Sequence, residues 1–173
     1  MKIRTIKTED HEKIDILIRE AFTDTENGYG NESELVNKIR KSNEYVYDLE
    51  VVAAVGDEIV GHGLLSEVKI VNEQNSYVGL VLAPLTTGTI YQGIGVGRKI
   101  IENLEERATK MNYQFISVLG HPDYYPRFGY VPASNYDIMA PFDVPDEAFM
   151  IKPLFENALD NVNGTIKYSS AFN

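Results

Sequence analysis

The sequence contains no cysteine, which excludes disulfides, thiolate metal ligands and a cysteine nucleophile. It has three histidines, and none stands in an H-E-x-x-H or similar spacing, so we expect no metal chemistry. No segment approaches the ~20 consecutive apolar residues of a membrane span, and Met1–Asp10 lacks the apolar stretch of a signal peptide. We therefore expect a soluble, cytoplasmic protein with no membrane partner.

Positive charge is also scarce. There are 16 Lys and Arg residues against 26 Asp and Glu residues, which gives a formal net charge of −10 at pH 7. The longest basic runs are the pairs Arg40-Lys41 and Arg98-Lys99, so nucleic acid is not an expected partner. An acidic surface attracts cations and would favour an amine or polyamine ligand, although such charge more often serves solubility.

The length of 173 residues suits one hydrophobic core, and the apolar share of 43% is typical of a globular chain. We find no internal repeat, no low-complexity tract and no linker long enough to separate domains. The sequence predicts a single domain over residues 1–173. It does not determine the oligomeric state, and a homodimer is one state compatible with it.

Apolar spacing predicts a short extended start followed by two helices. Thr8 is a candidate N-cap for the first helix, with carboxylates in its first turn. Its apolar positions are Ile14, Leu17, Ile18, Ala21 and Phe22. Asn31 and Glu34 resemble a capping box for a second, shorter helix that carries Leu35, Val36 and Ile39.

The middle of the chain changes to short apolar runs. Residues 51–55 and 59–65 read as a β-hairpin joined at Gly56-Asp57. The run 78–85 predicts another strand, and Pro84 places it at a sheet edge or at a bulge. Further strands are expected around 136–139 and 149–154 and near 166–168.

Residues 78–119 form a predicted strand, turn, helix and strand. The helix has one apolar face made by Ile100, Ile101, Leu104 and Ala108, and residues 115–119 read as a buried strand. A crossover of this length favours parallel pairing of the two strands. The predicted fold class is therefore α/β.

The turn between that first strand and the helix is rich in glycine: Gln92-Gly93-Ile94-Gly95-Val96-Gly97. Glycines at a helix N-terminus allow close approach of a ligand to free backbone N–H groups, which suits an anion such as phosphate. The helix opens with Arg98-Lys99, which the helix dipole disfavours unless an anion is bound there. A ligand-free tight turn is the alternative.

Two common phosphate-binding motifs do not fit this turn. The dinucleotide fingerprint G-x-G-x-x-G fails because Arg98 occupies the position of its third glycine. Gly88 and Gly93 have the spacing of a P-loop, but Ile94 and Gly95 stand where that motif requires Lys and Ser or Thr. NAD binding and ATP hydrolysis are therefore not expected.

The pattern that fits is Gln/Arg-x-x-Gly-x-Gly/Ala, matched by Gln92, Gly95 and Gly97 between a strand and a helix. Here the sequence resembles the GNAT superfamily of acyl-CoA-dependent N-acyltransferases. The resemblance implies a mixed central sheet, flanked by helices, whose fourth and fifth strands are parallel and splay apart. It also implies acetyl-CoA as co-substrate. Its expected binding residues are Leu85, Thr87, Gln92, Gly93, Ile94, Gly95, Val96, Gly97 and Arg98.

A second match lies downstream, in Pro-Asp-Tyr-Tyr-Pro-Arg-Phe-Gly-Tyr, which resembles the GNAT pattern Tyr-x-x-x-Gly-Phe/Tyr. Tyr125 takes the position of the general acid that protects the leaving thiolate, and the alternative is a tyrosine buried for packing. The preceding segment, from Gly120, is shorter than usual in the family and resembles one of its subgroups. That difference leaves Tyr124 as the second candidate.

The resemblance implies transfer of an acetyl group to a primary amine of a small molecule or peptide, by direct attack in a ternary complex. The base that deprotonates the amine does not follow from the sequence. His62, Glu67, Glu34 and His121 are candidates, but each is better explained as an ordinary structural or surface residue. A non-catalytic acyl-CoA-binding module is the alternative function, and a general nucleotide- or phosphate-binding protein is a further one.

Overall fold

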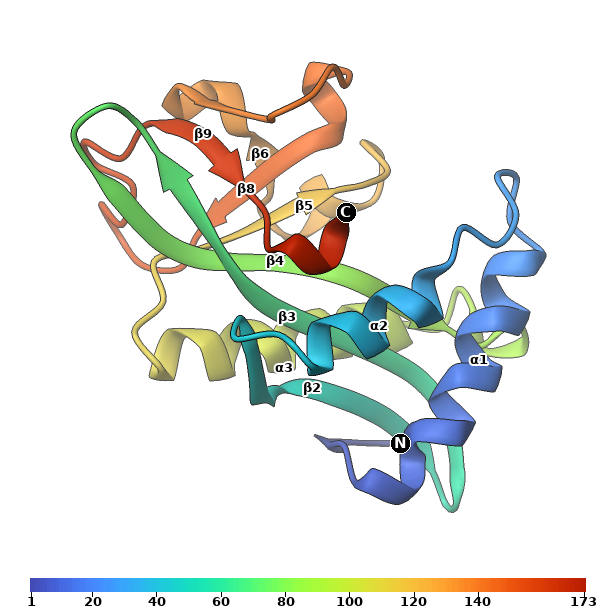
Figure 1. The fold of residues 1–173 in the computed structure, drawn as a ribbon. Coiled ribbons are helices and arrows are strands. Elements are labelled where there is room, and N and C mark those ends of the chain that lie inside the picture. The colour runs from blue at the N-terminus through green and yellow to red at the C-terminus, as the bar shows by residue number, and fades with distance from the viewer.

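The computed structural model describes residues 1–173, which form a mixed β-sheet with helices on both faces (Figure 1). The helices are α1 (His11–Thr23), α2 (Glu32–Arg40) and α3 (Val96–Lys110). The strands are β1 (Lys2–Thr5), β2 (Tyr45–Val55), β3 (Glu58–Val71), β4 (Ser76–Thr87), β5 (Phe115–Leu119), β6 (Val131–Pro132), β7 (Ile138–Met139), β8 (Phe149–Pro153) and β9 (Gly164–Lys167).

The strand order in the sheet is β1-β2-β3-β4-β5-β8-β6, and β9 joins the second half of β3 and pairs with β7. Neighbours are antiparallel except β4 with β5 and β7 with β9. This confirms the predicted mixed sheet with parallel fourth and fifth strands. It also confirms the hairpin, which turns at Gly56-Asp57 between β2 and β3.

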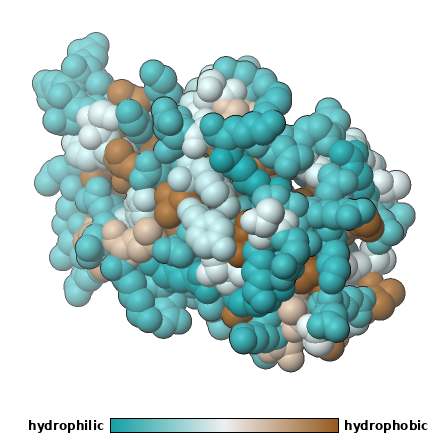
Figure 2. Space-filling view, turned by 60° about the horizontal axis from the view of Figure 1, so that its bottom comes forward, coloured by the Kyte–Doolittle hydropathy of each residue, from teal (hydrophilic) through white to brown (hydrophobic).

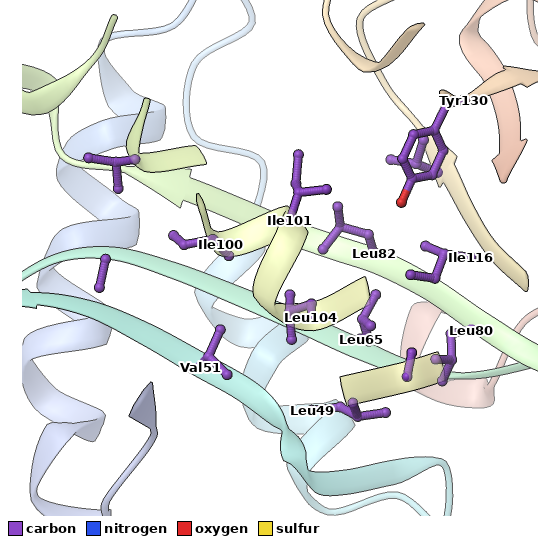
Figure 3. Close-up of a cluster of buried hydrophobic side chains, with 14 of the residues drawn as sticks. Leu49, Val51, Leu65, Leu80, Leu82, Ile100, Ile101, Leu104, Ile116 and Tyr130 are labelled. Carbon is purple, nitrogen blue, oxygen red and sulfur yellow. The ribbon is translucent and has the colours of Figure 1, made fainter. Parts of the chain in front are cut away.

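Side-chain alternation along the strands assigns the helices to opposite faces. Val51 of β2 and Leu65 of β3 belong to a core with α3 (Figure 3), in which Ile100, Ile101 and Leu104 are buried. Val52 and Leu64, one residue away in each strand, belong to a second core with α1 and α2. Successive strand residues point to opposite faces, so a one-residue step changes the helix that each contacts.

The parallel strands β4 and β5 separate soon after they meet. They pair only at Leu80 with Ile116 and at Val81 with Ser117. On its other side, β4 pairs Leu82 with Leu65 and Leu85 with Gly63, so it carries one residue more than β3 there. The extra length is a bulge at Ala83-Pro84, as predicted. The edge-strand alternative for Pro84 was wrong, because β4 has a neighbour on each side.

Two predicted helix caps were wrong, although both helices exist. Thr8 lies inside a 3-10 turn, η1 (Thr8–Asp10), and the carboxylate of Asp10 instead accepts a hydrogen bond from the Lys7 amide at 2.8 Å. Arg4 holds that carboxylate in place. Asn31 has a left-handed backbone in place of the extended one usual at an N-cap and makes no side-chain cap, and the Glu34 carboxylate binds Tyr29 and Arg19.

The late strands lie close to the predicted ranges. Residues 149–153 and 164–167 form β8 and β9. The predicted strand at 136–139 is shorter, because Tyr136 ends a 3-10 turn and only Ile138–Met139 pairs in the sheet. No helix has the length and apolar character to cross a membrane. Figure 2 shows one face of the molecule, which is mainly hydrophilic with small, separated hydrophobic patches.

A buried charge network fixes α2 to the sheet. The carboxylate of Glu50 accepts hydrogen bonds from Arg40 at 2.6 and 3.1 Å and from the Tyr45 hydroxyl at 2.7 Å, and it contacts His62 Nε2 at 2.7 Å. Burial raises the pKa of Glu50, but the bonds to His62 and Arg40 outweigh burial and lower this pKa to about 2. The carboxylate is therefore ionised in the folded protein.

We predict that Glu50→Gln lowers the free energy of unfolding by about 3 kcal/mol at pH 7, because it leaves the half-buried Arg40 without its counter-charge. The folded pKa lies below the unfolded value, so this stabilisation is lost as the pH falls from ~4.3 toward 2. Urea unfolding at several pH values measures it. The control, Glu73→Gln, alters an exposed carboxylate. Equal effects of the two substitutions would contradict the assigned role.

Candidate functional site

The glycine-rich turn leads from β4 into α3 through a short 3-10 turn, η2 (Thr89–Tyr91). Gly93 and Gly95 have φ angles of 81° and 88°, in the left-handed region that favours glycine. Gly97 is required for a different reason, since a Cβ there would lie 2.3 Å from the hydroxyl oxygen of Tyr124. Two glycines of the turn therefore adopt a backbone conformation that other residues disfavour, and the third leaves space for the Tyr124 hydroxyl.

The turn presents unpaired backbone donors. The amides from Gly93 to Arg98 donate to no backbone carbonyl, and the first helical hydrogen bond runs from the Lys99 amide to Gly95. No acidic residue lies in the first turn of α3, while Arg98 and Lys99 do. Free N–H groups, the positive end of the helix dipole and an arginine together suit a phosphate or diphosphate.

A cavity of about 690 Å³ lies beside this turn and along the separated strands. Its lining comes from β4, the glycine turn, the end of β5 and a 3-10 turn, η3 (Tyr125–Phe128), with further residues from α1 and α2. It includes nearly every residue predicted to bind a cofactor: Leu85, Thr87, Gln92, Gly93, Gly95, Val96, Gly97 and Arg98. The volume is in the range of small-molecule sites.

Ile94 is the exception. The residue is 69% exposed and does not line the cavity, although its amide is one of the free donors of the turn. The Gln92 side chain lies back against β4 and approaches the Thr87 carbonyl at 3.5 Å. Both observations fit a turn that offers main-chain atoms rather than side chains.

Tyr124 and Tyr125 both line the cavity but occupy different places. The Tyr124 hydroxyl lies over Gly97, and its ring packs edge-on against Phe128 with centroids 5.0 Å apart. The Tyr125 ring lies against Gly120, where an added Cβ would come within 2.4 Å of it. Neither hydroxyl donates or accepts a hydrogen bond within the chain, and neither oxygen is among the fully buried polar atoms that lack a partner. Both are therefore open to a ligand.

The Tyr125 ring packs against a residue of a small polar cluster, which consists of Tyr130, Glu105 and Lys152. The Tyr125 ring packs edge-on against Tyr130, with centroids 5.8 Å apart. The Tyr130 hydroxyl donates to Glu105 of α3 at 3.0 Å, and Lys152 of β8 also donates to Glu105 at 3.0 Å. Burial, with a smaller effect of Tyr124, raises the pKa of Tyr125 well above its usual value. Tyr125 therefore keeps its proton at neutral pH.

The candidate bases are mostly elsewhere. His62 is fully buried against Glu50, Glu67 accepts a hydrogen bond from Tyr113 at 2.6 Å, and Glu34 is bonded to Arg19 and Tyr29. Only His121 lines the cavity, with an exposed side chain. The structure thus gives three of these residues structural partners.

Sequence reasoning did not identify the cavity wall formed by α1 and α2. Phe22, Glu32 and Leu35 line it, and they come from a stretch whose apolar positions indicated only helix packing. Phe22 was assigned to the helix core, and Glu32 lay inside the predicted capping box of Asn31 and Glu34 without a role in it. The positions of these residues depend on how two helices meet the sheet, which residue spacing does not specify.

No protein-family model matches the sequence. Among curated proteins, the chain is 34% identical over 121 residues to the uncharacterized N-acetyltransferase YjhQ of Escherichia coli K12, covering 69% of this chain and 67% of that one. It is 28% identical over 173 residues to the uncharacterized N-acetyltransferase YhbS of the same strain, covering 100% and 99% of the two chains.

Solved structures share the fold. The GNAT family N-acetyltransferase YhbS from Escherichia coli, in complex with CoA, has a TM-score of 0.88 at 25% identity over 99% of this chain and 91% of that one. A GNAT family acetyltransferase from Brucella melitensis, in complex with acetyl-CoA, has a TM-score of 0.78 at 22% identity, covering 99% and 97%.

These relatives, the splayed parallel strands and the glycine turn define a class of protein. The chain belongs to the GNAT family of N-acetyltransferases. Both sequence matches on which the resemblance rested, at Gln92–Gly97 and at Tyr125–Tyr130, therefore lie in a chain of the family they indicated.

We predict that Gly95→Ala lowers the free energy of unfolding by about 1–2 kcal/mol, because alanine is strained at φ 88° even where space is open. The matched control is Gly88→Ala in the same segment, where φ is −55° and an added Cβ makes only ordinary contacts. Its effect should stay within ~0.5 kcal/mol. Urea unfolding of the two variants compares them, and equal losses would refute the conformational requirement.

Proposed function

We propose that residues 1–173 form a single N-acetyltransferase domain that transfers the acetyl group of acetyl-CoA to a primary amine. The observation that carries this proposal is the run of free amides from Gly93 to Arg98 at the mouth of the cavity. The similar proteins from Escherichia coli and Brucella melitensis were solved in complex with CoA and acetyl-CoA. A cytoplasmic location and a homodimer stay predictions.

The proposed cofactor position follows from two parts of the cavity lining, the glycine-rich turn and the edge of β4. The diphosphate accepts hydrogen bonds from the backbone amides of Gly93–Arg98, and the Arg98 side chain supplies a positive charge. The pantetheine arm extends along β4 at Leu85 and Thr87, where β5 has already separated and leaves main-chain groups without a parallel partner. The thioester then reaches the gap between the strands, beside Tyr125.

The proposed chemistry is direct attack on the thioester. The neutral amine nitrogen forms a bond to the acetyl carbonyl carbon, the tetrahedral intermediate loses its proton from nitrogen to water or a base, and the carbon–sulfur bond breaks. The departing thiolate takes a hydrogen bond or a proton from the Tyr125 hydroxyl. The raised pKa of Tyr125 keeps this donor protonated at the pH where the amine reacts.

The site also supports a second function, that of an acyl-CoA-binding module without turnover. The turn and the β4 edge would bind the cofactor equally well in such a module. The Tyr125 hydroxyl is open, and its ring packs against Tyr130, which is itself bonded to Glu105. This favours the enzyme, since cofactor binding alone does not require a free hydroxyl at this position. A thiol-release assay with acetyl-CoA and a panel of amines separates the two functions, because a module binds acetyl-CoA and releases no CoA.

We predict that Tyr125→Phe lowers kcat by about 10²-fold and leaves the KM for acetyl-CoA nearly unchanged, because only the leaving group loses its donor. Tyr124→Phe, the matched neighbour, should instead raise the KM for acetyl-CoA, since its hydroxyl lies over Gly97 at the phosphate turn. Steady-state kinetics of both variants measure the split. The reverse pattern would make Tyr124 the donor to the leaving thiolate. An unchanged kcat in both variants would show that neither tyrosine takes part in the acetyl transfer.

A further inference from the structure

The cavity is lined from both faces of the sheet. Arg98 and Tyr124 come from α3 and the segment beside η3, which pack with the core on one face. Phe22 and Leu35 come from α1 and α2, which pack with the core on the other face. The cavity therefore connects the two faces at the separated ends of β4 and β5. If the cofactor occupies the α3 face, the second substrate enters from the α1/α2 face.

The two faces differ in charge. Arg98 and Arg127 contribute positive charge on the phosphate side. Among all the lining residues only Glu32, at the start of α2, is a carboxylate. The remaining lining on the α1/α2 side is apolar, formed by Phe22 and Leu35 with Pro84 of β4 nearby in the lining.

Glu32 is also free of a cation. Its carboxylate accepts only from the Gly30 amide, at 2.8 and 3.2 Å, and it forms no salt bridge. The neighbouring carboxylate Glu34, two residues along the same helix, is paired with Arg19 at 2.6 Å and lies outside the cavity lining. Most acceptor positions of Glu32 are therefore open toward the cavity, whereas those of Glu34 serve packing of α1 on α2.

We infer that the α1/α2 wall is a binding site for an acceptor with two positively charged groups joined by an apolar stem. This inference rests on the proposed acetyl transfer. The nitrogen that attacks the thioester must be neutral, and a carboxylate contact would hold an ammonium protonated. The group paired with Glu32 is therefore a second cation, distinct from the reacting amine. Phe22 and Leu35 contact the stem between the two groups.

The substrate class is then that of diamines, polyamines and basic peptides rather than simple monoamines. The net charge of −10 adds long-range attraction for such cations, but it acts on every cation alike and does not select between them. Selection comes from the single carboxylate in an otherwise apolar wall. Glu32 is a specificity-determining residue in this account and takes no part in the acetyl transfer itself.

The test compares matched acceptors of equal length. The acceptors are α,ω-diaminoalkanes of about four to eight carbons and the n-alkylamines of the same chain length, with acetyl-CoA as donor. The wild-type protein should show a kcat/KM about 10- to 100-fold higher for the best diamine than for its monoamine, the effect of one charged hydrogen-bonded contact.

Glu32→Gln should remove this preference by raising the KM for the diamine, with the monoamine and the KM for acetyl-CoA unchanged. Glutamine still accepts from the Gly30 amide, so the start of α2 is preserved. Glu26→Gln is the matched control, since it removes the same charge from an exposed carboxylate that lies outside the cavity lining. Its kinetics should equal those of the wild type.

Three results would overturn the inference: no wild-type preference for diamines, equal losses for both acceptor types in Glu32→Gln, or the same change in Glu26→Gln. Failure of the proposed function looks different. In that case no CoA is released with any acceptor, or acetyl-CoA produces no thermal shift of the wild-type protein. If the protein releases CoA but its acceptor preference does not depend on Glu32, this inference is contradicted and the proposed function is not.

Discussion

The early separation of β4 from β5 is the constraint on which the rest of the site depends. Two residue pairs hold these strands together, and beyond Val81 and Ser117 the sheet is open at its centre. The bulge at Ala83-Pro84 bends β4 away at this point while β3 keeps its other edge paired. An interior opening of this kind leaves main-chain groups available between two intact halves of a sheet. A ligand can use them without disturbing the core.

The two cores on either side keep the opening in shape. Ile100 and Leu104 of α3 pack closely over Gly61 and Gly63 of β3, where a Cβ would collide with the isoleucine. On the other face, the Arg40–Glu50–His62 network fixes α2, whose first turn carries Glu32. The glycine-rich turn and the α1/α2 wall of the cavity are thus held by different interactions. We expect a change in one core to alter one of these two parts of the cavity and spare the other.

Local signals in the sequence were sufficient for most elements and for the glycine-rich turn that lines the cavity. The spacing of Ile100, Leu104 and Ala108 predicted α3, and the glycines of residues 92–97 predicted a turn at its start. These patterns are short-range, since each depends on backbone conformation or on one face of one helix. Residues within a few positions of each other carry the whole signal.

Features that depend on tertiary contact could not be predicted in the same way. The cap expected at Thr8 is not formed, and the Asp10 carboxylate, paired with Arg4 of the preceding strand, accepts from the Lys7 amide. His62 looked like a candidate base and instead lies against Glu50, on the strand before it. Glu32 had no role in the predicted capping box around it, and only the packing of α2 brings it to the cavity. Such partners are decided by the fold and leave no local pattern.

The central claim is that the free amides between β4 and α3 bind the diphosphate of acetyl-CoA. The most direct measurement is an NMR titration of the ¹⁵N-labelled protein with acetyl-CoA, followed at the backbone amides. The account predicts that the largest chemical-shift changes fall on residues 93–98, with smaller changes along β4 at Leu85 and Thr87. Saturable binding that leaves the amides of residues 93–98 unperturbed would contradict it.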